Sequence, residues 1–280
     1  MNIRTILLIS VMLAALNACT SHPSVPENHT NAGRPPVIYP DYKNVTVPCN
    51  IAPLNFSVME KANNSVARFT ADNISYTYGN GHKIQIDIDE WKEMLAAAKG
   101  ESIKVEVFAE KDGEWATYTP FYINVAEDEI DPYMSYRLIQ PSYVAYEGLS
   151  ISQRNLTNFE DKDIYNNMIV SDEITAQCIN CHSYQNYGTN SMQFHMRQGF
   201  GGTMIVCNGE ARKVDLKTDS TISAGVYPSW HPTLNLIAYS TNLTGQGFHT
   251  KSKAKIDVQD TRSDLILYDI DKNEVSNISA

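Results

Sequence analysis

Apolar and polar residues alternate in short runs between about residue 37 and residue 125. Period-2 alternation of this kind predicts β-strands that bury one face. Turn sequences such as Gly79–Gly81 and Lys111–Gly113 separate the runs and favour antiparallel hairpins. The pattern predicts a mainly β chain whose residues 41–130 form an antiparallel β-sandwich, with strands at Leu54–Val58, Val66–Phe69, Lys83–Ile88, Ser102–Ala109 and Phe121–Val125.

One helix is predicted inside this domain, over Asp89–Lys99. Acidic residues open the segment, strong helix formers fill it, and Gly100 follows as a C-cap. Trp91 and Trp115 have two interpretations, a ligand groove or ordinary packing, and aromatic residues in a sandwich usually pack.

The pattern changes between residues 131 and 200, where aromatic and polar residues alternate among several turn signals. We expect a mixed connector there. Its segment Phe159–Asn180 has Ile164, Met168 and Ile169 at helical spacing, which predicts a helix. A second short helix is predicted over Ser191–Arg197.

Residues 201–280 resemble a TolB-type β-propeller (PD40 or WD40-like repeats). Tyr227–Pro232, Leu236–Asn242 and Ser263–Ile270, with an outer strand at Val275, are similar to one blade. A blade takes about 40 residues and a propeller has about 4 to 8 blades. The resemblance therefore implies one to two blades of a truncated propeller, in which Gly202–Cys207 and Arg212–Leu216 close the preceding blade.

The N-terminus has the pattern of an export signal over residues 1–19. Arg4 precedes the apolar run Ile6–Leu16, which is too short to span a bilayer, and Ala18 precedes Cys19. The resemblance to bacterial lipoproteins implies that Cys19 is lipidated; an ordinary signal peptide is the alternative. Residues 20–40 are rich in Pro, Asn, Ser and His, which predicts a flexible tether with solvated His22 and His29.

The formal net charge of −10 argues against nucleic acid as a partner. The lysines at 251, 253 and 255 alternate with other residues and are typical of a solvated loop. No Gly-x-Ser-x-Gly sequence is present, so we do not predict a hydrolase.

The most informative motif is Cys178-Ile-Asn-Cys181-His182, the spacing by which c-type haem is attached. On one helical turn, two cysteines form thioethers to one porphyrin, and the next histidine binds the iron. Three other interpretations stay open: a disulfide, half of a zinc site, or a motif that no longer carries haem. Zinc would need further ligands, and Cys49 and Cys207 lie far away in the sequence.

A second axial iron ligand is expected near the motif. On the predicted helix Met192, His195 and Met196 share one face, and we favour His195, then Met192. The alternative is that Met192, Phe194 and Met196 are core residues and His195 only caps or hydrogen-bonds. Arg197 is a candidate partner for a haem propionate or for a surface ion pair.

The chain as a whole resembles exported lipoproteins of the Bacteroidetes type that join a sandwich, a Cys-x-x-Cys-His segment and a TolB-like propeller. The resemblance implies one covalent haem c and a lipid-anchored place in the cell envelope, facing the periplasm or in the outer membrane. We expect a non-enzymatic electron carrier or redox sensor with an envelope redox partner. The alternative is a binding or scaffold lipoprotein in which the motif is only structural.

Overall fold

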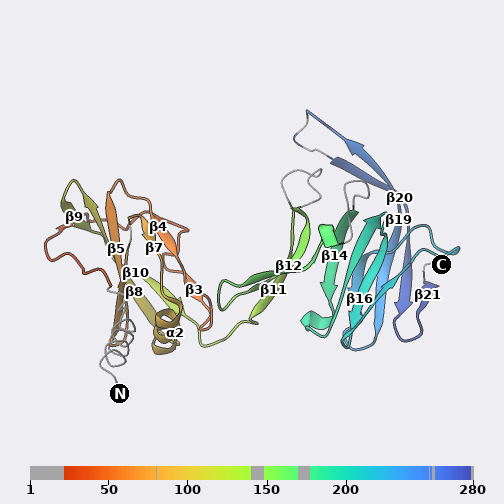
Figure 1. Cartoon of the computed structure of the whole chain (residues 1–280), viewed down its shortest axis with the longest axis horizontal. Helices are drawn as coiled ribbons and strands as arrows, with labels where there is room; N and C mark the ends of the chain where they lie inside the picture. The colour runs from red at the N-terminus through yellow and green to blue at the C-terminus, as the bar shows by residue number, and fades with distance from the viewer. Residues whose placement is uncertain are drawn as a thin grey trace, which may run out of the picture. The chain divides into compact units, whose positions relative to one another are not determined.

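The computed structural model, drawn in Figure 1, describes residues 22–79, 81–139, 148–169, 177–251, 253 and 256–278. The described chain is mainly β, as predicted. The signal sequence and Cys19 lie outside the described residues. Within the described ranges, no helix is long and apolar enough to cross a membrane. The chain divides into two compact units: unit 1 is Met1–Tyr133 with Asn155–Glu160, and unit 2 is Met134–Arg154 with Asp161–Ala280.

Unit 1 contains two sheets whose strands are mostly antiparallel. Parallel pairing occurs where β1 meets β9 and where β3 meets β10. The seven-stranded sheet contains β1 (Thr30–Asn31), β3 (Thr46–Val47), β5 (Asn64–Ala71), β6 (Ile74–Tyr78), β8 (Ser102–Lys111), β9 (Glu114–Thr117) and β10 (Phe121–Val125). The three-stranded sheet contains β2 (Ile38–Tyr39), β4 (Phe56–Val58) and β7 (Lys83–Ile84).

The two sheets of unit 1 and its helix share one core. Alternate residues of β10 are buried, because one face of the strand packs inward. Helix α2 (Ile88–Ala97) begins after Asp87, whose carboxylate accepts the amides of Asp89 and Glu90. Trp91 on α2 is fully buried, and its indole NH donates to the Ile51 carbonyl at 3.0 Å. Trp91 is therefore a core residue.

The prediction of a flexible tether over residues 20–40 is wrong for the described part of that segment. Strands β1 and β2 both lie in it and pair with β9 and β4. His22 and His29 are also held: the His29 ring packs edge-on against Phe108 at 5.2 Å, and His22 is hydrogen-bonded. Backbone pairing with distant strands has no local sequence signal, so composition alone suggested disorder.

The described residues of unit 2 form three antiparallel sheets. The first has β11 (Tyr133–Leu138), β12 (Ser150–Asn155) and β13 (Asp161–Asn166). The second, here called the motif sheet, has β14 (Gln177–Tyr184), β15 (Ser191–Gln198), β16 (Gly202–Cys207) and β17 (Glu210–Val214). The third, the C-terminal sheet, has β18 (Val226–Trp230), β19 (Leu236–Phe248), β20 (Ile256–Asp269) and β21 (Glu274–Asn277). Two 3₁₀ turns, η2 (Asn167–Ile169) and η3 (Gln185–Tyr187), flank β14.

The motif sheet packs on both faces. Ile151 of β12 contributes to one core with Ile179 and Phe194 of the motif sheet. On the other side, Ile205 of β16 shares a core with Ile237, Tyr239 and further residues of β19 and β20. The strands predicted at Gly202–Cys207 and Leu236–Asn242 are confirmed as β16 and part of β19. Beyond β18 and β21, the β19–β20 hairpin continues outward (Figure 1).

The predictions of two helices in the connector are wrong. Strand β13 and the 3₁₀ turn η2 occupy residues 161–169, residues 170–176 are not described, and Cys178 begins the motif within a strand. Residues Ser191–Gln198 form strand β15, of which the first six are buried. A strand buried on both faces lacks the alternation that identifies strands in a sequence, and its apolar run is compatible with a helix.

Candidate functional site

The Cys178–His182 motif lies on β14, the strand at the edge of the motif sheet. The prediction that the motif forms a helical turn is therefore wrong, because its backbone is an extended strand. The ladder with β15 pairs Asn180 with His195 and then Ser183 with Gln193. Cys181 and His182 thus form a β-bulge, because two residues on β14 stand against one on β15.

Cys181 takes the backbone conformation that the bulge requires. Its φ is +54°, in the left-handed region that a side chain with a β-carbon adopts at a cost. The Cys181 amide donates to Asn180 Oδ1 at 2.9 Å. Arg137 Nη1 of β11 also donates to Asn180 Oδ1, and Gln193 Nε2 donates to the Cys181 carbonyl. These bonds satisfy the polar groups that leave the ladder at the bulge.

His182 is half-buried beside β11. Burial lowers the pKa of His182, the positive charge of Arg137 lowers it further, and a hydrogen bond with the Ser135 backbone acts in the opposite direction. The imidazole is therefore neutral at pH 7, the form in which histidine binds metals.

The four described cysteines, Cys49, Cys178, Cys181 and Cys207, are half-buried free thiols. The structure therefore contains neither a Cys178–Cys181 disulfide nor a Cys49–Cys207 disulfide. Instead, Cys49 Sγ lies 3.5 Å from the carbonyl oxygens of Glu127 and Asp128. In the described part of the chain, no three His, Cys, Asp or Glu side chains are grouped as a metal site would require.

His195 lies on β15 directly opposite Asn180, with only 5% of its surface exposed. Its Nδ1 is 3.1 Å from Thr203 Oγ1. Burial, with a smaller contribution from the charge of Arg197, lowers the pKa of His195 to about 4. A neutral histidine with one ring nitrogen hydrogen-bonded to the protein is typical of a metal ligand, because the hydrogen bond fixes the ring.

His195 and Asn180 line a cavity of about 790 Å³ in unit 2. Cavities of this volume accommodate cofactor-sized ligands. Cys178 does not line the cavity: it packs against the apolar core of Ile151 and Ile179, although its partner across the ladder, Arg197, does line the cavity. Further lining side chains are mostly polar, among them Asp215, Lys217, Tyr227, Asn242, Thr244 and Gln246.

Of the other two candidate axial ligands, Met196 also lines the cavity and Met192 does not. Met192 and Met196 are buried in the apolar core that contains Ile151 and Ile179. Alternation along β15 places them on the face opposite to His195, so the predicted common face of Met192, His195 and Met196 is wrong. Of the two candidates that line the cavity, we favour His195, because its ring is hydrogen-bonded to Thr203 whereas Met196 packs in the apolar core.

The residues of the site fit a c-type haem by their chemistry. Two free thiols and a neutral imidazole are the groups that haem attachment uses. Among the described residues, Arg137 Nε and Gln193 Oε1 beside the motif are buried without hydrogen-bond partners, which is expected next to a polar ligand group. The fit therefore rests on donor atoms, not on a helical motif.

Sequence reasoning missed four residues of this site: Arg137, Asn180, Gln193 and Thr203. Asn180 stands inside the motif at a position usually treated as variable. Thr203 is brought opposite His195 by the register of β15 and β16, and Arg137 reaches Asn180 from a strand of another sheet. No local signal identifies them.

No family model, curated protein or solved structure matches this chain. The assignment of function therefore depends on the motif and its surroundings.

Proposed function

We propose that this chain is a lipid-anchored protein of the cell envelope that carries one covalent c-type haem. Cys178 and Cys181 form the thioethers, and His182 binds the iron. The observation that carries the proposal is the position of all three on an edge strand, where a bulge removes Cys181 and His182 from the ladder. Free, partly exposed thiols there are accessible to the attachment machinery.

His195 would be the second protein ligand of the iron. Thr203 holds its ring, burial keeps it neutral, and it lines the cavity next to the motif. Arg197 and Arg137 are cations within reach of this region and suit the carboxylates of a haem. When bound, haem c supplies a one-electron iron couple, which suits electron transfer or redox sensing.

We also propose a specific fold for each of the two units. Unit 1 is a sandwich of its two sheets, and the motif and C-terminal sheets are blades of a TolB-like propeller. Both blades are four-stranded antiparallel meanders that share a core, as successive propeller blades do. Gln185 supports the packing, since its amide donates to the carbonyls of His231 and Leu234 at 2.9 Å.

The envelope location follows from Cys19 and its signal sequence. A diacylglyceryl group on Cys19 anchors the chain without a membrane span.

The test is expression of the full chain in a bacterial host that matures c-type cytochromes. We expect a Soret band that stays with the protein after acid–acetone extraction. The Cys178→Ala/Cys181→Ala variant should lose it, whereas Cys49→Ala and Cys207→Ala are matched controls that keep it. Wild-type protein without covalent haem in this host would overturn the proposal.

A second candidate is a scaffold lipoprotein in which the motif is structural. One observation favours it: Asn180 and His182 tie β14 to Arg137 and Ser135 of β11. In that case the His182→Ala variant, made in a host without haem maturation, has a lower free energy of unfolding than wild type. No haem is attached to the wild-type chain in any host.

A further inference from the structure

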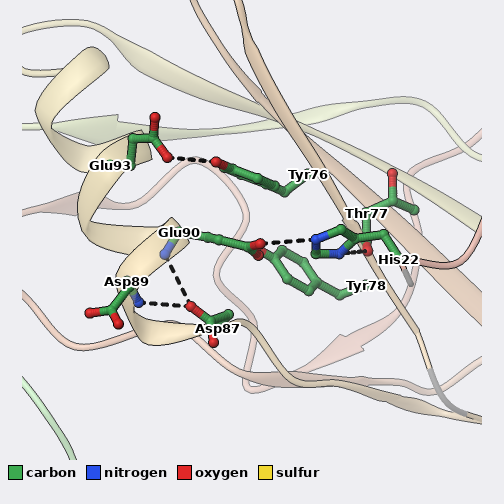
Figure 2. Close-up of polar contacts among 8 residues, drawn as sticks. All are labelled: His22, Tyr76, Thr77, Tyr78, Asp87, Asp89, Glu90 and Glu93. Atoms are coloured by element: carbon green, nitrogen blue, oxygen red, sulfur yellow. Dashed lines mark hydrogen bonds and ion pairs between the residues drawn. The ribbon is translucent and has the colours of Figure 1, made fainter. Parts of the chain in front are cut away.

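The first described residue after the lipidation site is held firmly on unit 1. His22 Nε2 lies 2.9 Å from Glu90 Oε1, and Nδ1 lies 3.1 Å from the Thr77 carbonyl oxygen. Its ring also packs against Tyr76 and Tyr78, with centroids 5.7 and 5.6 Å apart. Figure 2 shows the imidazole lying between β6 and the start of α2. Both ring nitrogens are therefore hydrogen-bonded, and the ring contacts two tyrosines while staying partly exposed.

The groups that receive His22 are themselves fixed. Tyr78 donates to the second oxygen of Glu90 at 2.6 Å, and Tyr76 donates to Glu93 at 2.5 Å (Figure 2). The hydrogen bond to Glu93 raises the pKa of Tyr76 to about 12, and burial, followed by the bond to Glu90, raises the pKa of Tyr78. Both phenols therefore stay protonated donors at physiological pH. The binding site for His22 is preformed by the fold of unit 1.

The position of His22 limits how far unit 1 can lie from the lipid. Only three residue steps separate Cys19 from His22, and three steps of extended chain span at most about 11 Å. If residues 22–29 were free, the first strand pairing would be at Thr30. Eleven flexible residues would then give a typical reach of about 18 Å and a maximum of about 38 Å.

We infer that the face of unit 1 around His22, formed by β6 and the start of α2, is a membrane-apposed surface whose partner is the lipid headgroup layer. The inference rests on the proposed lipidation of Cys19. Polar and charged side chains cover this face, including Lys83, Gln85, Asp87 and Glu90 around a cavity of about 380 Å³. Such a surface lies against headgroups and does not enter the acyl region. His22 thus holds unit 1 close to the membrane surface, with the face around β6 and the start of α2 turned toward the headgroups.

Amine labelling tests this surface. The lipidated full chain is placed on phosphatidylethanolamine–phosphatidylglycerol vesicles, and a membrane-impermeant amine reagent is added. For each lysine, protection is the labelling rate in a chain made without the signal peptide divided by the rate on vesicles. We expect several-fold protection of Lys83, which lines the His22 cavity, and none of Lys111. Lys111 lies five residues along β8 from Glu106, about 17 Å from the level of Thr77.

Two variants separate this role of His22 from other effects. His22→Ala should remove the protection of Lys83, and the exposed position of His22 means that the core is untouched. Glu93→Gln is the matched control: it changes a carboxylate one helical turn away that bonds Tyr76 and not His22, and it should keep the protection. The unlipidated reference corrects for any direct effect of His22 on Lys83.

The two hypotheses fail in different ways. A chain that is not lipidated does not bind the vesicles, which contradicts the proposed anchor. A chain that binds vesicles but labels Lys83 and Lys111 with equal protection, or protects Lys83 equally in His22→Ala, contradicts the membrane-apposed surface.

Discussion

His195 is a buried titratable side chain, and its burial makes stability depend on pH. Its pKa is about 4 in the folded chain, against 6.5 in an exposed histidine. Between these values the unfolded chain binds a proton that the folded chain does not, so the free energy of unfolding falls as the pH falls through this window. Above pH 6.5 the effect vanishes.

We therefore expect haem-free protein to lose about 1–2 kcal/mol of stability between pH 7 and pH 5 through His195. Urea unfolding followed by circular dichroism measures this change. His195→Gln should reduce the loss, whereas His249→Gln, at an exposed ion pair with Asp257, should not. An equal loss in wild type and His195→Gln would show that burial of His195 is not the cause.

At the scale of elements, the bulge in β14 depends on the side chain of Asn180. That amide accepts hydrogen bonds from the Cys181 amide and from Arg137, and it thereby supports a left-handed residue and links β14 to β11. Asn180→Ala removes both bonds and should cost about 1–2 kcal/mol of unfolding free energy. Chemical denaturation measures the cost.

The control for this prediction is Asn190→Ala, which changes the same side chain at an exposed position before β15. It should stay within about 0.5 kcal/mol of wild type. The Asn180 variant should also attach less haem if the bulge presents Cys181 and His182. If Asn180→Ala had the stability and haem content of wild type, neither the bulge nor haem attachment would depend on the Asn180 side chain.

The same scale explains which elements the sequence predicts. Strands β8 and β10 were predictable because burial alternates along most of their length, and α2 because Asp87, Asp89 and Glu90 mark its start. Strand β15 was not, because its first six residues are all buried and show no alternation. For β14, the motif itself suggested a helical turn, and the pairing with β15 that decides its conformation comes from residues further along the chain.

At the scale of the molecule, the mainly β fold was predictable and the contents of the connector were not. The described residues of the connector over 131–200 form five strands, β11 to β15, of which β11 and β15 supply partners of the motif on β14. The residues of β11 and β13 are exposed or half-buried throughout, so their sequence pattern resembles that of loops.

The two units have separate cores, which predicts two unfolding transitions. Phe69 is fully buried in unit 1 among Phe56, Tyr78 and Trp91, and Ile237 is fully buried in unit 2. Phe69→Ala should cost about 3–5 kcal/mol and Ile237→Ala about 2–5 kcal/mol. In scanning calorimetry of the full chain, each should lower one transition by roughly 10 °C and leave the other in place. Each variant is the control for the other, because both delete a buried side chain. If both variants lowered the same transition, the two units would unfold as a single cooperative body.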